Sequence, residues 1–177
     1  MKEFFFSLML IILNLNMLAQ DNSKTDGNQL NKIIVDTNIN KEIMIGQCDK
    51  NGIESFAGFN LDFRTEYDDY QVNKELLSQY KDILSNYRIT IVMGTWCGDS
   101  KREVPRFFKI IDELGISEDI VTIICVDRKK KAGDLEIEKF QIKLVPTFII
   151  TKDNIEKGRI VEQPKENLES DIIQIIK

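Results

Sequence analysis

Apolar residues recur along this chain either at helical spacing or in short unbroken runs, and the two patterns alternate. Steps of three and four residues predict an amphipathic helix over residues 72–87 and a second one whose apolar stripe ends at Gly115. The apolar runs at Arg88–Met93 and Ile120–Val126 are typical of buried strands. From residue 71 onward, the chain therefore alternates helices with strands.

The remaining patterns complete one α/β layer architecture. Thr147–Thr151 and Lys157–Val161 flank a polar turn, which predicts an antiparallel hairpin. Asp134 is placed to cap a short helix that runs through Phe140, and Pro164 suits the first turn of a last helix. We expect one central sheet that is flanked by helices.

The first residues have the pattern of an export signal. Lys2 provides a basic start, and the apolar stretch after it is interrupted by Asn14 and Asn16. The stretch is therefore shorter than the roughly 20 apolar residues of a membrane-spanning helix, and Ala19 provides a cleavage point. We expect residues 1–19 to be a cleavable signal and the chain to be secreted or periplasmic. An uncleaved signal that holds the chain at the membrane is the alternative.

Two further segments precede the α/β pattern. Residues 20–41 are rich in Asn, Asp and Lys, which predicts a polar tether. Residues 42–70 form an N-terminal extension, in which Asn51-Gly52 predicts a hairpin turn because both residue types tolerate positive φ. This β-hairpin would span Glu42–Phe59, and the α/β domain would follow over residues 71–177.

Composition narrows the chemistry of the chain. Its 24 basic and 29 acidic residues give a formal net charge of −5, which argues against nonspecific binding to nucleic acid or to an anionic membrane. Histidine is absent, so Ser-His-Asp triads and imidazole metal ligands are excluded. Three scattered cysteines, Cys48, Cys97 and Cys125, lack the spacing of a zinc site. We therefore expect neither a metal nor a cofactor.

Trp96-Cys97-Gly98-Asp99-Ser100 carries the strongest chemical signal. The segment joins a predicted strand to a predicted helix, which places the Cys97 sulfur beside the unpaired N–H groups of a helix start and stabilises its thiolate. The spacing is that of a two-cysteine redox site, but Ser100 takes the second position. The Ser100 hydroxyl lies one helical turn away and can donate to the thiolate, whereas the Asp99 carboxylate opposes a second negative charge.

This motif and two others resemble the thioredoxin-like family over Gln71–Lys177. Trp96–Ser100 stands where the family has Trp-Cys-x-x-Cys. Pro105 lies eight residues after Cys97, where the family places the proline that kinks the active-site helix. Phe140–Thr147 is similar to the family's stretch that ends in Ile-Pro-Thr, whose proline is cis and faces the cysteine. The resemblance implies a thioredoxin-like fold, with a central mixed sheet flanked by helices and the cysteine as the attacking sulfur.

The resemblance also implies roles for neighbouring residues. Val145, Pro146 and Thr147 would dock an extended substrate along its backbone, and a cis Val145–Pro146 bond would turn the Val145 backbone groups outward for this purpose. Trp96 would either form a wall of the site or serve packing alone. Ile91 stands where the family buries an aspartate that handles protons for the second sulfur. The absence of that aspartate is consistent with the absence of the second cysteine, because the aspartate has little purpose without the second thiol. The two absences fit a specialised one-cysteine mechanism and a decayed enzyme equally well.

These residues predict thiol–disulfide exchange by a single thiol. A mixed disulfide on Cys97 must be released by an external thiol, by the substrate's own second cysteine, or by another cysteine of this chain. Cys48 is the better candidate for this resolving role, because Cys125 lies in a run typical of a core strand. The predicted function is reduction or isomerisation of disulfides in envelope proteins or small thiols. The alternative is a redox-inactive module that binds peptides or proteins.

Two other readings depend on residues around the motif. The basic run Arg128–Lys131 is either a solvated loop or, if the two buried strands are parallel, a loop on the edge that carries Cys97, where it would attract acidic partners. A peroxidase site would need a threonine three residues before the cysteine, but this chain has Gly94 there. Copper delivery would need paired cysteines and a histidine, which the chain lacks.

Overall fold

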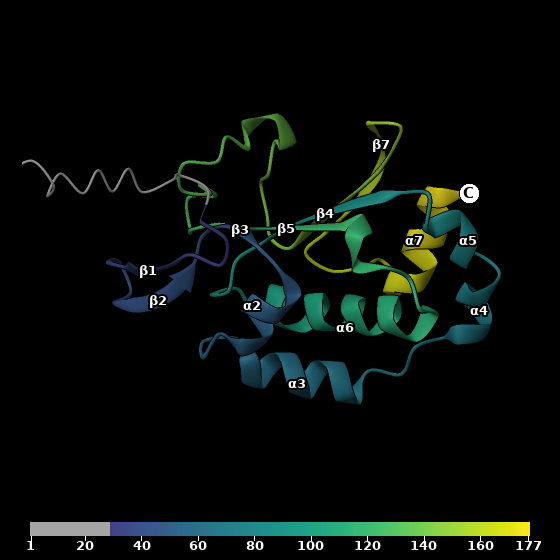
Figure 1. The fold of residues 1–177 in the computed structure, drawn as a ribbon, viewed down its shortest axis with the longest axis horizontal. Helices are drawn as coiled ribbons and strands as arrows, with labels where there is room; N and C mark the ends of the chain where they lie inside the picture. The colour runs from purple at the N-terminus through teal and green to yellow at the C-terminus, as the bar shows by residue number, and fades with distance from the viewer. Residues whose placement is uncertain (1–28) are drawn as a thin grey trace, which may run out of the picture.

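A five-stranded sheet organises the computed structural model, which describes residues 29–177 (Figure 1). The predicted export signal, residues 1–19, lies outside the described residues. In spatial order, β3-β5-β4-β6-β7, the strands are Gly46–Cys48, Val121–Cys125, Arg88–Met93, Thr147–Lys152 and Ile155–Val161. β4 and β5 are parallel, and the other neighbours are antiparallel, so the sheet is mixed as expected.

The helices pack chiefly on one face of this sheet. They are α2 Lys50–Ser55, α3 Asn60–Asp69, α4 Lys74–Ser78, α5 Lys81–Leu84, α6 Gly98–Leu114 and α7 Leu168–Ile176. The core on this face joins buried side chains of α6 and α7 to alternate residues of β4, namely Ile89, Ile91 and Met93. α3 lies on the outer side of α6, so the molecule has a third layer there (Figure 1). Over residues 29–177, no helix combines the length and the apolar character that crossing a bilayer requires.

The opposite face of the sheet is covered by the connection between β5 and β6. Val92, Ile124 and Ile149 of the sheet pack with Ile137 and Val145 of this connection. The aliphatic side chains on both faces are nearly inaccessible to solvent, and burying each one contributes about 1.5–3 kcal/mol to folding. The sheet therefore separates two apolar cores.

The short helix predicted from Asp134 to Phe140 is wrong for most of its length. Only a 3-10 turn, Glu138–Phe140, forms. Asp134 instead lies in a tight turn, closed by a bridge between Ala132 and Leu135, and the left-handed φ of 67° at Gly133 fits such a turn.

The segment predicted as a tether contains a strand in its described part. β1 (Ile33–Asp36) pairs antiparallel with β2 (Lys41–Met44) to form a separate hairpin. The tether prediction is wrong here. It rested on the polar composition of residues 20–41 as a whole, although Ile33–Val35 within them is a β-branched run that favours a strand. The Ile43 and Met44 side chains are 1% exposed, so this hairpin is anchored in the apolar interior.

The β-hairpin predicted over Glu42–Phe59 is also wrong. Its expected turn is the first turn of α2, because the Asp49 carboxylate accepts a hydrogen bond from the Gly52 N–H at 2.7 Å and caps the helix. β3 precedes this cap and joins the edge of the central sheet beside β5. An N-terminal β-hairpin is present, but it is the preceding one, β1–β2.

The single helix predicted over residues 72–87 is broken into α4 and α5. The break falls where the Tyr80 N–H bonds the Leu77 carbonyl oxygen at 2.8 Å, a three-residue step that ends the α-helical pattern. Leu84 and Tyr87 of the predicted apolar stripe are buried, but Ile83 of that stripe is 42% exposed. Leu77, which lies outside the stripe, is fully buried instead. The periodicity thus identified the buried side only near its C-terminal end and missed the break in the helix.

The last helix begins later than predicted. α7 starts at Leu168 with Asn167 as its N-cap, whose side chain accepts from the Ser170 N–H at 2.8 Å. The start near Pro164 is wrong because the Asp171 carboxylate binds the Lys165 N–H at 2.8 Å and holds that segment in a turn. In contrast, α6 and the hairpin β6–β7 occupy the predicted segments.

Candidate active site

Cys97 stands at the junction between β4 and α6. It is the N-cap residue of α6, with extended backbone angles of φ −96° and ψ 127°, and its carbonyl oxygen accepts from the Lys101 N–H at 3.0 Å. α6 has 17 residues, so the partial positive charge of its N-terminus lies beside the sulfur. The Cys97 side chain is partly exposed. The local sequence therefore produces an accessible thiol at a helix start.

The Cys97 thiol contacts the segment that leads into β6. Its Sγ donates to the Val145 carbonyl oxygen at 3.1 Å, and the Val145–Pro146 peptide bond is cis. Thr147 begins β6, and its hydroxyl donates to the Leu144 carbonyl oxygen at 2.7 Å. The structure thus brings the three residues expected to dock substrate beside the sulfur. The thiol itself occupies the Val145 carbonyl, which the sequence analysis expected to face outward.

Ser100 is fully buried and binds backbone rather than the sulfur. Its Oγ accepts a hydrogen bond from the Gly94 N–H at 3.3 Å, which ties the end of β4 to the first turn of α6. Ser100 and Cys97 both lie in the described part of the chain, and the expected hydrogen bond between them is not formed. A protonated thiol is itself a donor, so it bonds an acceptor, the Val145 carbonyl oxygen.

Trp96 packs beside Cys97 against the apolar cluster that covers this face of the sheet. A Cβ atom on Gly94 would lie 2.6 Å from the Trp96 ring, so the indole packs directly on the glycine backbone. The Trp96 Nε1–H donates to the Val126 carbonyl oxygen at 2.8 Å. The Arg128 guanidinium carbon lies 4.7 Å from a ring centroid of Trp96, within the range of a cation–π contact.

The loop that follows β5 lies on the edge that carries Cys97. β4 and β5 are parallel, with Met93 opposite Cys125, so their carboxyl ends meet there. The Lys130 ammonium also approaches the Trp96 ring, at 5.5 Å from its centroid. Of the two interpretations of Arg128–Lys131, the structure selects the loop beside the site.

The N-terminal hairpin β1–β2 contacts the surroundings of Trp96 through residues that sequence reasoning missed. The Met44 N–H donates to the buried Thr95 hydroxyl at 3.2 Å. Asp36 is 7% exposed, and its Oδ2 lies 3.9 Å from the Arg128 Nε. Asp36 therefore faces Arg128, which packs on the tryptophan. The basic run marked one side of this contact, but no sequence signal connected it to Asp36.

Asp99 is paired with Arg102 one helical turn away. The two side chains form an ion pair at 2.7 Å, and Arg102 also binds Glu103 at 2.6 Å. The bond to Glu103, more than the bond to Asp99, raises the pKa of the Arg102 guanidinium above its ordinary value. The repulsion that the sequence analysis expected between Asp99 and a thiolate is therefore reduced by a neighbouring positive charge.

Cys48 does not lie with Cys97. Cys48 is 4% exposed in the core under α6, whereas Cys97 packs against the core on the opposite face of the sheet. The thiol beside Cys48 is Cys125, whose pKa is raised by the hydrogen bond between the two thiols and by complete burial. The assignment of Cys48 as resolving thiol for Cys97 is wrong, because the sheet separates the two sulfurs.

No group of three or more His, Cys, Asp or Glu side chains is arranged to hold a metal ion within residues 29–177.

The sequence matches the thioredoxin family over residues 71–175, which is more than half of the chain. This chain belongs to the thioredoxin family. Its fold is accordingly the thioredoxin fold, a central mixed sheet flanked by helices, and the hairpin β1–β2, β3, α2 and α3 precede the matched region.

Individual relatives match only parts of the chain. Chloroplastic thioredoxin Y2 of Arabidopsis thaliana is 29% identical over 83 residues, which cover 45% of this chain and 47% of that protein. The chain thus spans about half the length of this relative. Oxidised thioredoxin O2 of the same plant is 25% identical, with a TM-score of 0.39, covering 59% of this chain and 86% of its own. A Pseudomonas aeruginosa protein of unknown function is 16% identical, with a TM-score of 0.46, over 69% and 75% of the two chains.

Proposed function

We propose that this chain is an exported thioredoxin-family protein that exchanges thiols and disulfides through Cys97 alone. The observation that carries the proposal is the partly exposed Cys97 sulfur at the start of α6, with Ser100 in the second motif position. The helix N-terminus favours the thiolate, which is the attacking species in disulfide exchange. The Val145 carbonyl oxygen accepts the Cys97 thiol and would become free for a substrate N–H once the thiol loses its proton.

The first chemical step exchanges one disulfide for another. Cys97 loses its proton to water, and the thiolate attacks one sulfur of a substrate disulfide. The substrate S–S bond breaks, a Cys97–substrate disulfide forms, and the leaving sulfur departs as a thiolate that takes a proton from water. The Val145 carbonyl oxygen has then lost its thiol donor and accepts an N–H from the extended substrate backbone.

The second step needs a thiol from outside the site. Ser100 carries no sulfur, and Cys48 and Cys125 are buried on the far side of the sheet. If another cysteine of the substrate, not the one displaced in the first step, attacks the substrate sulfur bound to Cys97, a different substrate disulfide closes. The Cys97 thiolate is then released without net oxidation, which is isomerisation. If external thiols attack, two of them are oxidised to a disulfide while the substrate is reduced.

Trapping the mixed disulfide tests this proposal. The full chain is incubated with a disulfide-bonded peptide at neutral pH and analysed by mass spectrometry. We expect one peptide adduct on Cys97, loss of that adduct in Cys97→Ser, and its persistence in the control Cys48→Ala. Ser100→Cys should add catalytic reductase turnover with dithiothreitol. An unreactive Cys97 would refute the proposal and favour the binding-module alternative, in which Cys97→Ala leaves partner binding intact.

Export rests on residues 1–19 and has its own test. When the full chain is produced in a secreting bacterial host, N-terminal sequencing of the envelope fraction should begin at Gln20. Recovery of the protein in the cytoplasm with Met1 intact would contradict export but would leave the chemistry of Cys97 untouched.

A further inference from the structure

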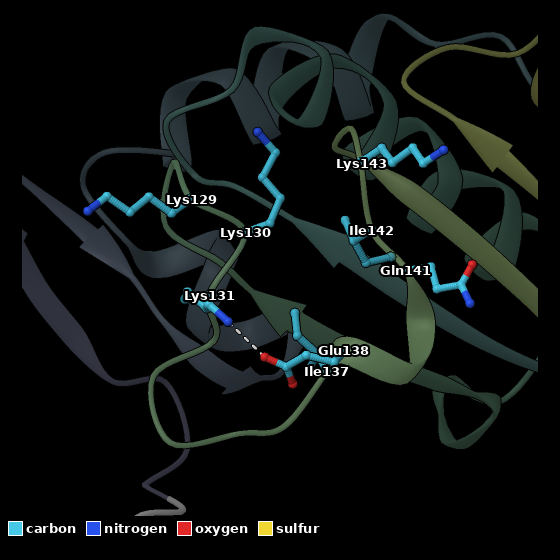
Figure 2. Close-up of a pocket in the computed structure, with 8 residues that line it drawn as sticks. All are labelled: Lys129, Lys130, Lys131, Ile137, Glu138, Gln141, Ile142 and Lys143. Carbon is cyan, nitrogen blue, oxygen red and sulfur yellow. Dashed lines mark hydrogen bonds and ion pairs between the residues drawn. The ribbon is translucent and has the colours of Figure 1, made fainter.

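A cavity of about 460 Å³ lies in the cover of the sheet, on the same side as Cys97. Two segments line it, the loop after β5 and the stretch Ile137–Lys143 (Figure 2). Four of its lining side chains are lysines: Lys129, Lys130, Lys131 and Lys143. Such a concentration of positive charge is unexpected on a chain whose formal net charge is −5.

Three of these lysines keep their charge available. Lys131 forms an ion pair with Glu138 at 2.8 Å, drawn as the dashed line in Figure 2. Among residues 29–177, no such pair joins Lys129, Lys130 or Lys143 to a carboxylate. We call these three residues, with the apolar Ile142 between them, the lysine groove.

The backbone of the loop fixes where its lysines point. The Asp127 carboxylate accepts hydrogen bonds from the N–H groups of Lys129 and Lys131, both at 2.8 Å. These bonds stabilise the turn, and Asp127 forms them with backbone N–H groups rather than with the lysine ammonium groups. Lys130 has a left-handed φ of 60°, which a lysine adopts rarely, and its ammonium donates to the Arg128 carbonyl oxygen at 3.3 Å. The positive charges are therefore presented by a defined loop conformation.

The lysine groove is continuous with the proposed exchange site. Ile142 packs in the same apolar cluster as Trp96 and Cys97, and Lys130 lies over the Trp96 ring. Lys143 precedes Val145 by two residues, which is roughly 7 Å of extended chain. A peptide that bonds the Val145 carbonyl would bring the residues next to its cysteine to the groove.

We infer that the lysine groove binds an acidic polypeptide segment next to the reacting cysteine of the substrate. The inference rests on the proposed exchange at Cys97 and names the class of substrate. The lysine side chains point in different directions around an open cavity rather than converging on one spot (Figure 2). This spread of charge fits carboxylates distributed along a chain, and the partly exposed Ile142 supplies apolar surface for the methylene groups between them.

Two disulfide-bonded peptides of equal length, one with Asp and Glu flanking the cysteine and one with Lys, test the groove. At low ionic strength the full chain should form the mixed disulfide with the acidic peptide on the order of tenfold faster, and added salt should remove the difference. The triple variant Lys129→Gln/Lys130→Gln/Lys143→Gln should lose most of this preference. The control Lys152→Gln/Lys157→Gln/Lys177→Gln makes the same charge change in β6, in β7 and at the end of α7, outside the lysine groove, and should retain the preference.

Failure of the groove differs from failure of the exchange chemistry. Equal rates for the two peptides, or equal loss of preference in both triple variants, would overturn the acidic-substrate inference while exchange at Cys97 stands. If neither peptide forms an adduct, the proposed exchange fails. Binding of the same peptides in reduced form is then measured by fluorescence anisotropy. Tighter binding of the acidic peptide, lost in the groove variant and kept in the control variant, would support the groove.

Discussion

At the scale of single residues, Cys97 and Ser100 bond different backbone groups rather than each other. The thiol donates to the Val145 carbonyl oxygen, and Ser100 accepts from the Gly94 backbone instead. The Asp99 carboxylate, which sequence reasoning counted against a thiolate, is paired with Arg102. The motif therefore separates its tasks, with the cysteine available for reaction and the serine holding the turn.

Removing the Ser100 hydroxyl should affect stability more than exchange. Ser100→Ala leaves the buried Gly94 N–H without its acceptor, which costs about 1–3 kcal/mol of the free energy of unfolding. Urea denaturation measures this loss, and the rate of mixed-disulfide formation on Cys97 should change by less than about threefold. An unchanged stability with a large loss of exchange rate would show that Ser100 acts on the sulfur directly.

Two glycines of the motif region form a matched pair for a packing test. In Gly94→Ala, the added methyl group meets the Trp96 ring at 2.6 Å, and this overpacking should destabilise the fold by about 1–3 kcal/mol. A methyl group added to Gly98 would meet nothing within 4 Å, so Gly98→Ala should be neutral or stabilise the start of α6 by about 0.5 kcal/mol. Trp96 is the chain's one tryptophan, so its fluorescence should shift only in the first variant. A shift in both variants would contradict the packing argument.

At the scale of elements, the added helices α2 and α3 are fastened to α6 by one polar network. The Asp112 carboxylate of α6 accepts from the Tyr67 hydroxyl and from the Lys50 ammonium, both at 2.6 Å. The Tyr67 ring stacks on Phe63, with 5.8 Å between their centroids. The segment before the family-matched region thus packs directly on the helix that positions Cys97.

This network makes an alkaline prediction. Burial and the bond to Asp112 raise the pKa of Tyr67 to about 12, above the value of about 10 for an unfolded tyrosine. Its contribution to stability is therefore complete below pH 10 and is lost as the pH rises toward 12. Tyr67→Phe should cost about 1 kcal/mol at pH 8, and its difference from the wild type should shrink above pH 10. Urea denaturation of both proteins between pH 8 and pH 12 measures this difference in the free energy of unfolding. A difference that does not change with pH would contradict the raised pKa of Tyr67.

At the scale of the whole molecule, the sheet separates the free cysteine Cys97 from the other two free cysteines. Cys48 and Cys125 belong to the core under α6, while Cys97 lies against the opposite core and reaches solvent. Iodoacetamide should therefore label Cys97 alone in the native protein and all three cysteines in urea, as mass spectrometry would show. Labelling of Cys48 at a rate similar to that of Cys97 under native conditions would contradict this arrangement.

Sequence spacing predicted the elements whose signals are local. β4, α6 and the hairpin β6–β7 were predicted correctly because their apolar periodicities and turn residues lie within each element. Asp49-Lys50-Asn51-Gly52 carries equally good signals for a hairpin turn and for a helix cap. Hydrogen bonds from a distant part of the chain favour the helix cap. The Asn31 side chain donates to the Asp49 carboxylate and accepts from the Asp49 N–H, both at 3.0 Å.

Residue order alone established the family, the segment that bears Cys97 and the lack of a second cysteine in the motif, because each of these is a property of neighbouring positions. The folded chain was needed to show that Cys48 faces Cys125, that Asp36 faces Arg128 and that the lysines gather beside Trp96. The physical reason is that each of these contacts joins residues distant in the chain. Strand pairing and core burial fix such contacts, and no spacing within one segment encodes them.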